Sequence, residues 1–315
     1  MRRNGATLGA GHRPKLSIGS WAFGIYSERP LPFEQVLDRV SDLGFDGMEL
    51  GAFEPHPDPL TCAGAGARAA LRETFDRREL AVSAVAADFG SEGFLTVDEP
   101  HEYLAAMDRN LEFTRALGAG RLIINTVDPP ETPHTVGQAL ARERLLETWG
   151  EAAKRAATAG VTLAWEFEPC WAFNEPEQII ELAHALSGPG FGVLYDTAHA
   201  HAVAAVGARH IGGAKPLAGG QVELLERLRG TIVHVHLLDS DGSIHEGKDS
   251  TERTTVHMPF GQGNVAFDEV IPALSRAGGL TEWWTVDLCF WPDAWEATAA
   301  SKQFVDGLLA CTELP

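Results

Sequence analysis

The chain has 315 residues, of which 44% are hydrophobic and 22% are charged. That balance is ordinary for a globular protein and excludes an intrinsically disordered one. Its 25 Lys and Arg residues against 44 Asp and Glu residues give a formal net charge of −19, so nucleic acid and anionic membranes are poor partners. No apolar run reaches the roughly 18 residues of a membrane span, and we expect a cytoplasmic protein.

The N-terminal residues and the cysteines are consistent with a cytoplasmic protein. Residues 1–14 contain two arginines but no apolar signal-peptide core, so we predict a flexible lead-in. Cys62, Cys170, Cys289 and Cys311 lie far apart and have no C-x-x-C spacing. This pattern favours reduced, mostly buried thiols over disulfides or a cysteine-based zinc site.

Short apolar runs typical of buried strands alternate with longer stretches of helical periodicity. The eight predicted strands are Lys15–Gly19, Phe45–Leu50, Leu80–Val85, Arg121–Asn125, Val161–Phe167, Phe191–Tyr195, Thr231–Leu237 and Thr281–Leu288. The predicted helices include Phe33–Leu43, Ala67–Arg78, His101–Leu117, Val136–Thr158, Glu177–Leu186, Phe267–Arg276 and Trp295–Leu309. Strands that are apolar on both faces and alternate with helices predict a parallel sheet covered by helices.

Eight such repeats fit a single α/β domain, a (β/α)8 TIM barrel over residues 15–315, better than an open sheet. A doubly wound sheet would place a G-x-G-x-x-G turn after its first strand, but residues 19–24 read G-S-W-A-F-G. Gly44, Gly160 and Gly278 come just before predicted strands, where glycine would end a helix and turn the chain back toward the sheet.

Carboxylate and imidazole side chains gather at the ends of the last four predicted strands. They are Glu166 and Glu168 at the fifth strand, Asp196 and His199 at the sixth, His234 and His236 on the seventh, and Asp287 at the eighth. In a TIM barrel these strand ends form the rim that carries the active site. Buried carboxylates are costly unless a cation or hydrogen bonds meet them, so the pattern predicts one divalent metal ion bound through oxygen and nitrogen ligands.

The same residues resemble the xylose-isomerase-like TIM barrels, the sugar phosphate isomerases and epimerases that share a superfamily with AP endonuclease type 2. The motifs are G-V-x-L-A-x-E at 160–166, D-T-x-H at 196–199, H-V-H-L-x-D at 234–239 and H-x-P-x-G-x-G-x-V at 257–265. Residues 15–19 and 45–50 are similar to the first two strands of that family, and the resemblance covers roughly residues 15–310.

The resemblance implies a metal held by Glu166, Asp196, His236 and the acid of the eighth strand. That acid is Asp287, where the family usually has Glu. Glu166 and Asp287 would also form the catalytic acid–base pair. We favour Glu166 over Glu168 as the ligand because of its offset from the glycine before the strand, and Glu168 is then a substrate contact or an alternate ligand.

The substrate site is expected to include residues around this metal. His199 resembles the substrate-contacting histidine of the family, and His257 begins the turn before the seventh helix of the repeat. Trp21 is one of several aromatic residues at strand ends that would wall a sugar site. Arg253, together with Lys248, is a nearby cation in the long loop after the seventh strand. For His201 and His234, structural and functional roles remain equally open.

The implied function is a divalent-metal-dependent isomerase or epimerase that acts on a keto-sugar or cyclitol through an enediolate. Manganese is the first expectation for the metal, with cobalt, magnesium, zinc and iron as alternatives. The alternative function is a metal-dependent lyase that dehydrates an inosose or eliminates from an oxidised glycoside, because one enolate serves both reactions. A DNA-repair endonuclease of the same superfamily is disfavoured, because it would need further metal ligands and a cationic face, whereas this chain has a net charge of −19. The expected partner is a small carbohydrate, and a homo-oligomer stays open.

Overall fold

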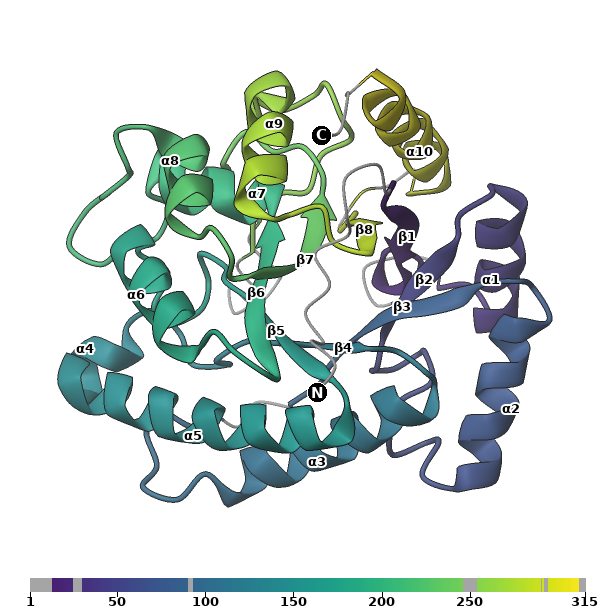
Figure 1. Cartoon of the computed structure of the whole chain (residues 1–315), viewed down its shortest axis with the longest axis horizontal. Helices are drawn as coiled ribbons and strands as arrows, with labels where there is room; N and C mark the ends of the chain where they lie inside the picture. The colour runs from purple at the N-terminus through teal and green to yellow at the C-terminus, as the bar shows by residue number, and fades with distance from the viewer. Residues whose placement is uncertain are drawn as a thin grey trace.

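In the computed structural model, the described residues are 13–24, 30–89, 93–245, 254–289, 291 and 294–311. Eight parallel strands close into a barrel in which each pairs with the next and the last pairs with the first. They are β1 (Lys15–Gly19), β2 (Gly47–Gly51), β3 (Ala81–Ala86), β4 (Arg121–Ile124), β5 (Thr162–Glu166), β6 (Phe191–Asp196), β7 (Ile232–Leu237) and β8 (Trp283–Val286). The predicted (β/α)8 TIM barrel is confirmed, and Figure 1 shows its helices arranged around the strands.

Each of the predicted helical segments contains a helix. The α-helices are α1 (Phe33–Asp42), α2 (Ala65–Asp76), α3 (His101–Ala116), α4 (Thr132–Val136), α5 (Gln138–Ala159), α6 (Pro176–Leu186), α7 (Thr197–Ala200), α8 (Gly220–Arg227), α9 (Phe267–Ala277) and α10 (Ala294–Cys311). Gly160 ends α5 with φ 74° and Gly278 ends α9 with φ 94°, as the sequence predicts. Within the described part of the chain, no helix combines the length and apolar composition needed to cross a membrane.

Two helical regions differ from the prediction. The helix expected to start at Val136 is divided at Gly137, whose φ of 108° and ψ of 123° end α4 and allow α5 to begin. Between β6 and β7 the chain forms α7, the π-helical η2 (His201–Val206) and α8, none of which was predicted. α7 and η2 are rich in alanine, which gives no clear apolar stripe, so helical periodicity is weak there. α8 contains no alanine, but it has only eight residues, which is a short span for a periodic signal.

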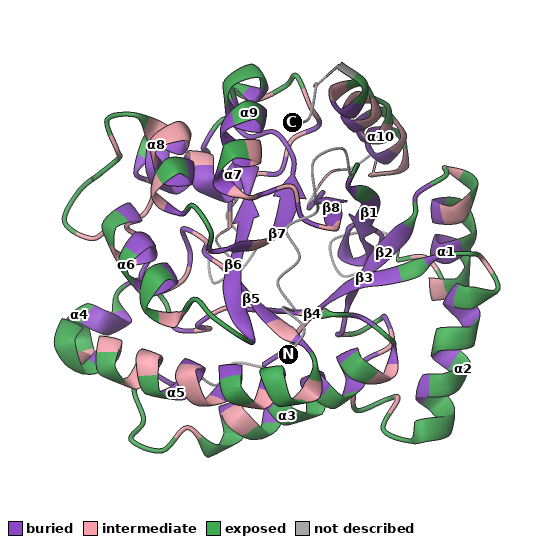
Figure 2. Cartoon of the chain, viewed as in Figure 1, coloured by how far each residue is buried: buried purple, intermediate pink, exposed green. Residues whose placement is uncertain are grey.

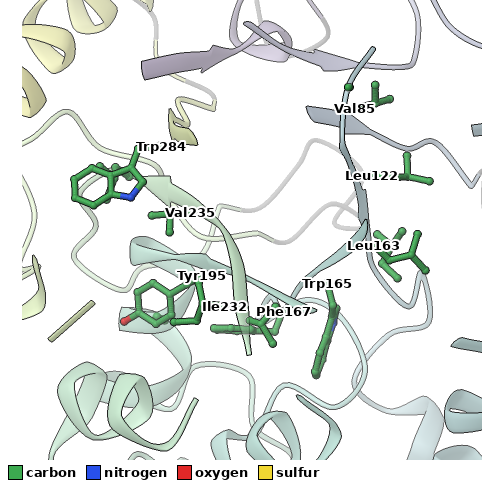
Figure 3. Close-up of a cluster of buried hydrophobic side chains, with 14 of the residues drawn as sticks. Val85, Leu122, Leu163, Trp165, Phe167, Tyr195, Ile232, Val235 and Trp284 are labelled. Carbon is green, nitrogen blue, oxygen red and sulfur yellow. The ribbon is translucent and has the colours of Figure 1, made fainter. Parts of the chain in front are cut away.

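The main hydrophobic core lies between the barrel and the helices. Trp165 on β5 packs against Trp149 on α5, with ring centroids 5.4 Å apart. Figure 3 shows side chains of this layer from β3 to β8, and Figure 2 shows buried strands surrounded by helices with exposed outer faces. The core therefore fixes the strands from outside and leaves their inward positions for other residues.

The interior of the barrel has an apolar half and a polar half. On β3 to β6 the inward side chains form a small apolar cluster of Ala84, Ile123, Ala164 and Leu194. On β1, β2, β7 and β8 they form a buried hydrogen-bonded group of Ser17, Glu49, His234 and Thr285. Since β2 and β7 are not neighbours, the contact between Glu49 and His234 crosses the barrel interior.

Candidate metal centre

Four side chains from successive strands converge at the C-terminal ends of β5 to β8. Nδ1 of His236 lies 3.0 Å from Oε1 of Glu166, 3.5 Å from Oδ2 of Asp287 and 3.7 Å from Oδ2 of Asp196. Their candidate ligand atoms all lie within 4.8 Å of one another. The structure thus places side by side all four residues that the sequence assigns as metal ligands. We call them the four-residue group.

The chemistry of the four-residue group fits a divalent cation. Oδ2 of Asp196 and Nδ1 of His236 are buried and have no hydrogen-bond partner among the residues that the structure describes. Buried acceptors without donors and clustered carboxylates are costly unless a cation meets them. Three carboxylates and one imidazole nitrogen are a donor set that suits Mn²⁺, Zn²⁺, Co²⁺ or Fe²⁺.

The carboxylates of the four-residue group have strongly shifted pKa values. Burial, reinforced by the charges of Glu168 and Asp287, raises the pKa of Glu166 to about 8. Burial and the charge of Asp287 raise the pKa of Asp196 to about 7. Burial also acts on Asp287, but the charges of His257 and His236 outweigh it and hold the pKa of Asp287 well below its usual range. Such opposed shifts are typical of functional sites.

Trp21 holds Asp287 in place. It lies in the 3-10 helix η1 (Ser20–Phe23), which follows β1, and its Nε1 donates a hydrogen bond of 2.6 Å to Oδ1 of Asp287. The thiol of Cys289 lies 3.5 Å from the same oxygen. Oδ2 of Asp287 therefore remains for His236 and the centre of the group. The sequence placed Trp21 at the site but did not predict this contact.

Glu168 has a different environment from Glu166. It accepts hydrogen bonds from Oγ1 of Thr254 at 2.8 Å, from Nε1 of Trp171 at 2.9 Å and from Sγ of Cys170 at 3.2 Å. These donors occupy both oxygens of its carboxylate, and Glu168 is not part of the four-residue group. The arrangement supports the assignment of Glu166 as ligand and leaves Glu168 at the border of the site.

Two histidines border the group next to Glu168. Nδ1 of His199 lies 2.5 Å from Oγ1 of Thr255, and Nε2 lies 3.7 Å from Oε2 of Glu168. The ring of His257 lies 5.2 Å from that of His199, centroid to centroid. Both ring nitrogens of His257 are buried without a hydrogen-bond partner in the described residues. Nδ1 of His257 nevertheless faces Oδ2 of Asp287 at 3.4 Å, so Nε2 is the ring nitrogen of His257 left for a polar group of a ligand.

Asp239 holds the turn that carries His257. Its carboxylate accepts hydrogen bonds from the backbone N–H groups of Gly261, Gly263 and Val265 at 2.8, 2.9 and 3.1 Å. A Cβ atom at Gly263 would lie 2.4 Å from Oδ1 of Asp239, so only glycine allows this approach. The contact explains why the H-x-P-x-G-x-G-x-V pattern accompanies an acid at the end of the H-V-H-L-x-D pattern.

Some predicted residues cannot be placed. Arg253 and Lys248, the cations expected near the substrate, lie outside the described residues, as do residues 1–12 of the expected lead-in. His201 is half-buried at the start of η2. His234 is fully buried inside the barrel, where its Nε2 contacts Glu49.

Glu49 is a buried acid next to the site that sequence analysis did not assign to it. Its carboxylate contacts Nε2 of His234 at 2.7 Å and Nε2 of His236 at 3.0 Å. Burial acts to raise the pKa of Glu49, but the two histidines lower it to about 2. The available signal in the sequence was an acid inside the predicted strand Phe45–Leu50, and the structure buries every residue of Gly47–Gly51.

Fold and site together define a TIM barrel with a candidate metal centre at its C-terminal rim. The family model described as "Xylose isomerase-like TIM barrel" matches residues 37–303. The chain therefore belongs to this family, as the motifs predicted. Among curated proteins, none matches its sequence.

Solved structures with the same fold include proteins with different chemistry. The IolI protein with a zinc atom is 19% identical, with a TM-score of 0.71 over 94% of this chain and 98% of that chain. The D-allulose 3-epimerase from Methylomonas sp. in complex with D-allulose is 13% identical, with a TM-score of 0.67 over 94% and 97%. The probable 3-DHS dehydratase AsbF from Bacillus anthracis is 15% identical, with a TM-score of 0.68 over 93% and 98%.

Proposed function

We propose that this protein is a divalent-metal-dependent isomerase or epimerase that acts on a keto-sugar or cyclitol through an enediolate. The observation that carries the proposal is the four-residue group, in which Asp196 and His236 direct buried, unpartnered atoms toward Glu166 and Asp287. Manganese is the metal we expect, and the zinc atom of the similar IolI structure makes zinc the first alternative.

The chain's own residues supply the proton transfers and the binding contacts. When bound, the divalent ion would polarise a substrate carbonyl and acidify the neighbouring C–H bond. Glu166 and Asp287 approach from different strands, β5 and β8, and we assign them as the acid–base pair that removes and returns the proton. His199, His257 and Glu168 border the group, and we assign them to substrate hydroxyl groups.

A lyase of the same substrate class is the second candidate. Asp287 stands where the family usually has Glu, and Trp21 fixes one of its oxygens at 2.6 Å. A shorter and fixed acid is less able to return a proton to the far face of a substrate. The same enediolate or enolate would then lose a leaving group instead, and the fold is shared with a probable dehydratase.

Deuterium exchange tests the proposed reaction. The full-length protein, stripped of metal and reloaded with Mn²⁺, is incubated in D2O with a panel of keto-sugars and inososes. We expect deuterium next to the carbonyl of the substrate only in the reloaded sample. The stripped protein should be slower by at least about a hundredfold, because a Lewis acid supplies several kcal/mol of transition-state stabilisation.

The products distinguish the two candidates. An isomer or epimer that carries deuterium supports the proposed reaction, whereas a product that has lost water or an alcohol supports the lyase. A fully metal-loaded protein that exchanges no deuterium into any ketone of the panel contradicts both.

A further inference from the structure

Glu49 lies between the two histidines of β7, on the side of His236 opposite the four-residue group. Oε1 of Glu49 is 3.0 Å from Nε2 of His236, and Oε2 is 2.7 Å from Nε2 of His234. Thr285 donates a hydrogen bond of 2.9 Å to Oε2, and Oγ of Ser17 lies 2.8 Å from Oγ1 of Thr285. These five side chains are all buried, so no bulk solvent competes for the hydrogen bonds.

These contacts fix the position of one proton of the His236 ring. An ionised carboxylate only accepts hydrogen bonds, so both imidazoles must carry a proton on Nε2. A neutral imidazole with its proton on Nε2 has its lone pair on Nδ1. Nδ1 of His236 is the atom that faces Glu166, Asp196 and Asp287.

We propose that Glu49 is a positioning residue of the metal centre. Its carboxylate accepts the Nε2–H of His236, which fixes the ring and keeps the Nδ1 lone pair directed at the ion. His234 and Thr285 both contact Oε2 of Glu49, which leaves Oε1 directed at His236. This inference rests on the proposed function, because it presupposes an ion held by the four-residue group.

A second ion between Glu49 and the two imidazoles is the competing account, since these ligand atoms also lie within 4.8 Å of one another. The N···O separations of 2.7 and 3.0 Å are the lengths of direct hydrogen bonds. Two ligands of one ion, each about 2.0–2.2 Å from it, lie roughly 2.9 Å or more apart. The 2.7 Å contact with His234 is too short for such a pair, whereas the 3.0 Å contact with His236 fits either account. The geometry therefore favours hydrogen bonds, and the number of ions bound per chain decides between the accounts.

Zinc affinity of the full-length chain, measured by competition with a chelator, tests the role of Glu49. The wild type should bind one ion. Glu49→Gln keeps one acceptor oxygen, which serves only one imidazole, and should weaken binding by about tenfold. Glu49→Met has a similar length and no such acceptor, and should weaken binding by about a hundredfold. Ser17→Ala is the matched control, because Ser17 belongs to the same buried network without contacting Glu49, and its affinity should stay within about twofold of wild type.

Nitrogen NMR of the zinc-loaded wild type gives a readout that needs no Glu49 variant. With ¹⁵N-labelled histidine, the His236 signals are identified by their loss in His236→Gln. We expect a proton on Nε2 and zinc on Nδ1. This pattern reports the orientation of the ring directly, which a loss of folding stability would not change.

The possible outcomes separate the inference from the proposed function. A folded Glu49→Met variant with wild-type zinc affinity, or a wild-type His236 bound through Nε2, overturns the role of Glu49. A second zinc ion that disappears in both Glu49 variants overturns it in favour of an ion between the histidines. A wild type that binds no zinc, manganese or cobalt overturns the proposed function instead.

Discussion

Glu166→Gln is expected to remove both the bound metal and turnover. The substitution keeps the shape of the side chain but removes one of three carboxylate charges that face Nδ1 of His236. A charge-assisted contact is worth far more than a neutral one, so the cation would be left under-neutralised. We expect turnover to fall by at least about a thousandfold, which corresponds to about 4 kcal/mol. Metal analysis of the purified protein and initial rates on the substrate found by deuterium exchange measure both effects.

Glu168→Gln is the matched comparison, two residues along the chain. Thr254, Trp171 and Cys170 hold this carboxylate outside the four-residue group. We therefore expect Glu168→Gln to keep the metal and to raise KM or lower kcat, as a lost substrate hydrogen bond of about 0.5–3 kcal/mol would. If Glu168→Gln loses the ion while Glu166→Gln retains it, the assignment of the ligand is wrong by one inward-facing position.

Asp287→Asn should have the second largest effect. Oδ2 of Asp287 lies 3.5 Å from Nδ1 of His236 and 3.4 Å from Nδ1 of His257. Its negative charge therefore interacts favourably with both imidazoles. An amide places no negative charge there, so the ion and the imidazoles lose a common counter-charge. We expect metal affinity to fall by at least about a hundredfold. This loss is larger than is typical for a residue that contacts a metal-binding side chain but not the ion itself. Chelator competition measures the affinity.

Cys289→Ser is the control for Asp287→Asn. The thiol lies 3.5 Å from Oδ1 of Asp287, and a serine hydroxyl can still donate to that oxygen. Metal affinity should therefore stay within about twofold of wild type if the charge of Asp287, and not the packing around it, holds the ion. Equal losses in the two variants would show that the prediction for Asp287 is wrong.

The strands and most helices could be predicted because their signals are local. Runs that are apolar on both faces mark buried parallel strands, and glycines such as Gly160 mark helix ends. α7 and η2 were missed because alanine-rich sequence has no clear apolar stripe, and α8 because its pattern spans only eight residues. Gly137 was missed as a break because a glycine inside a periodic segment also occurs within helices.

The candidate site was predictable in its strand-end residues and not in its supporting contacts. Glu166, Asp196, His236 and Asp287 could be found because the ends of parallel strands share one rim. Glu49 could not be paired with His236 from the sequence, since their strands are distant along the chain and meet only across the closed barrel. The contact of Trp21 with Asp287 depends likewise on the pairing of β1 with β8.

Anomalous diffraction from crystals soaked in Mn²⁺ tests the metal centre most directly. We predict one anomalous peak at the C-terminal rim, within about 2.5 Å of Glu166, Asp196, Nδ1 of His236 and Asp287. A rim without a peak, or a peak more than about 3 Å from these side chains, would contradict the assignment of the four-residue group as a metal site.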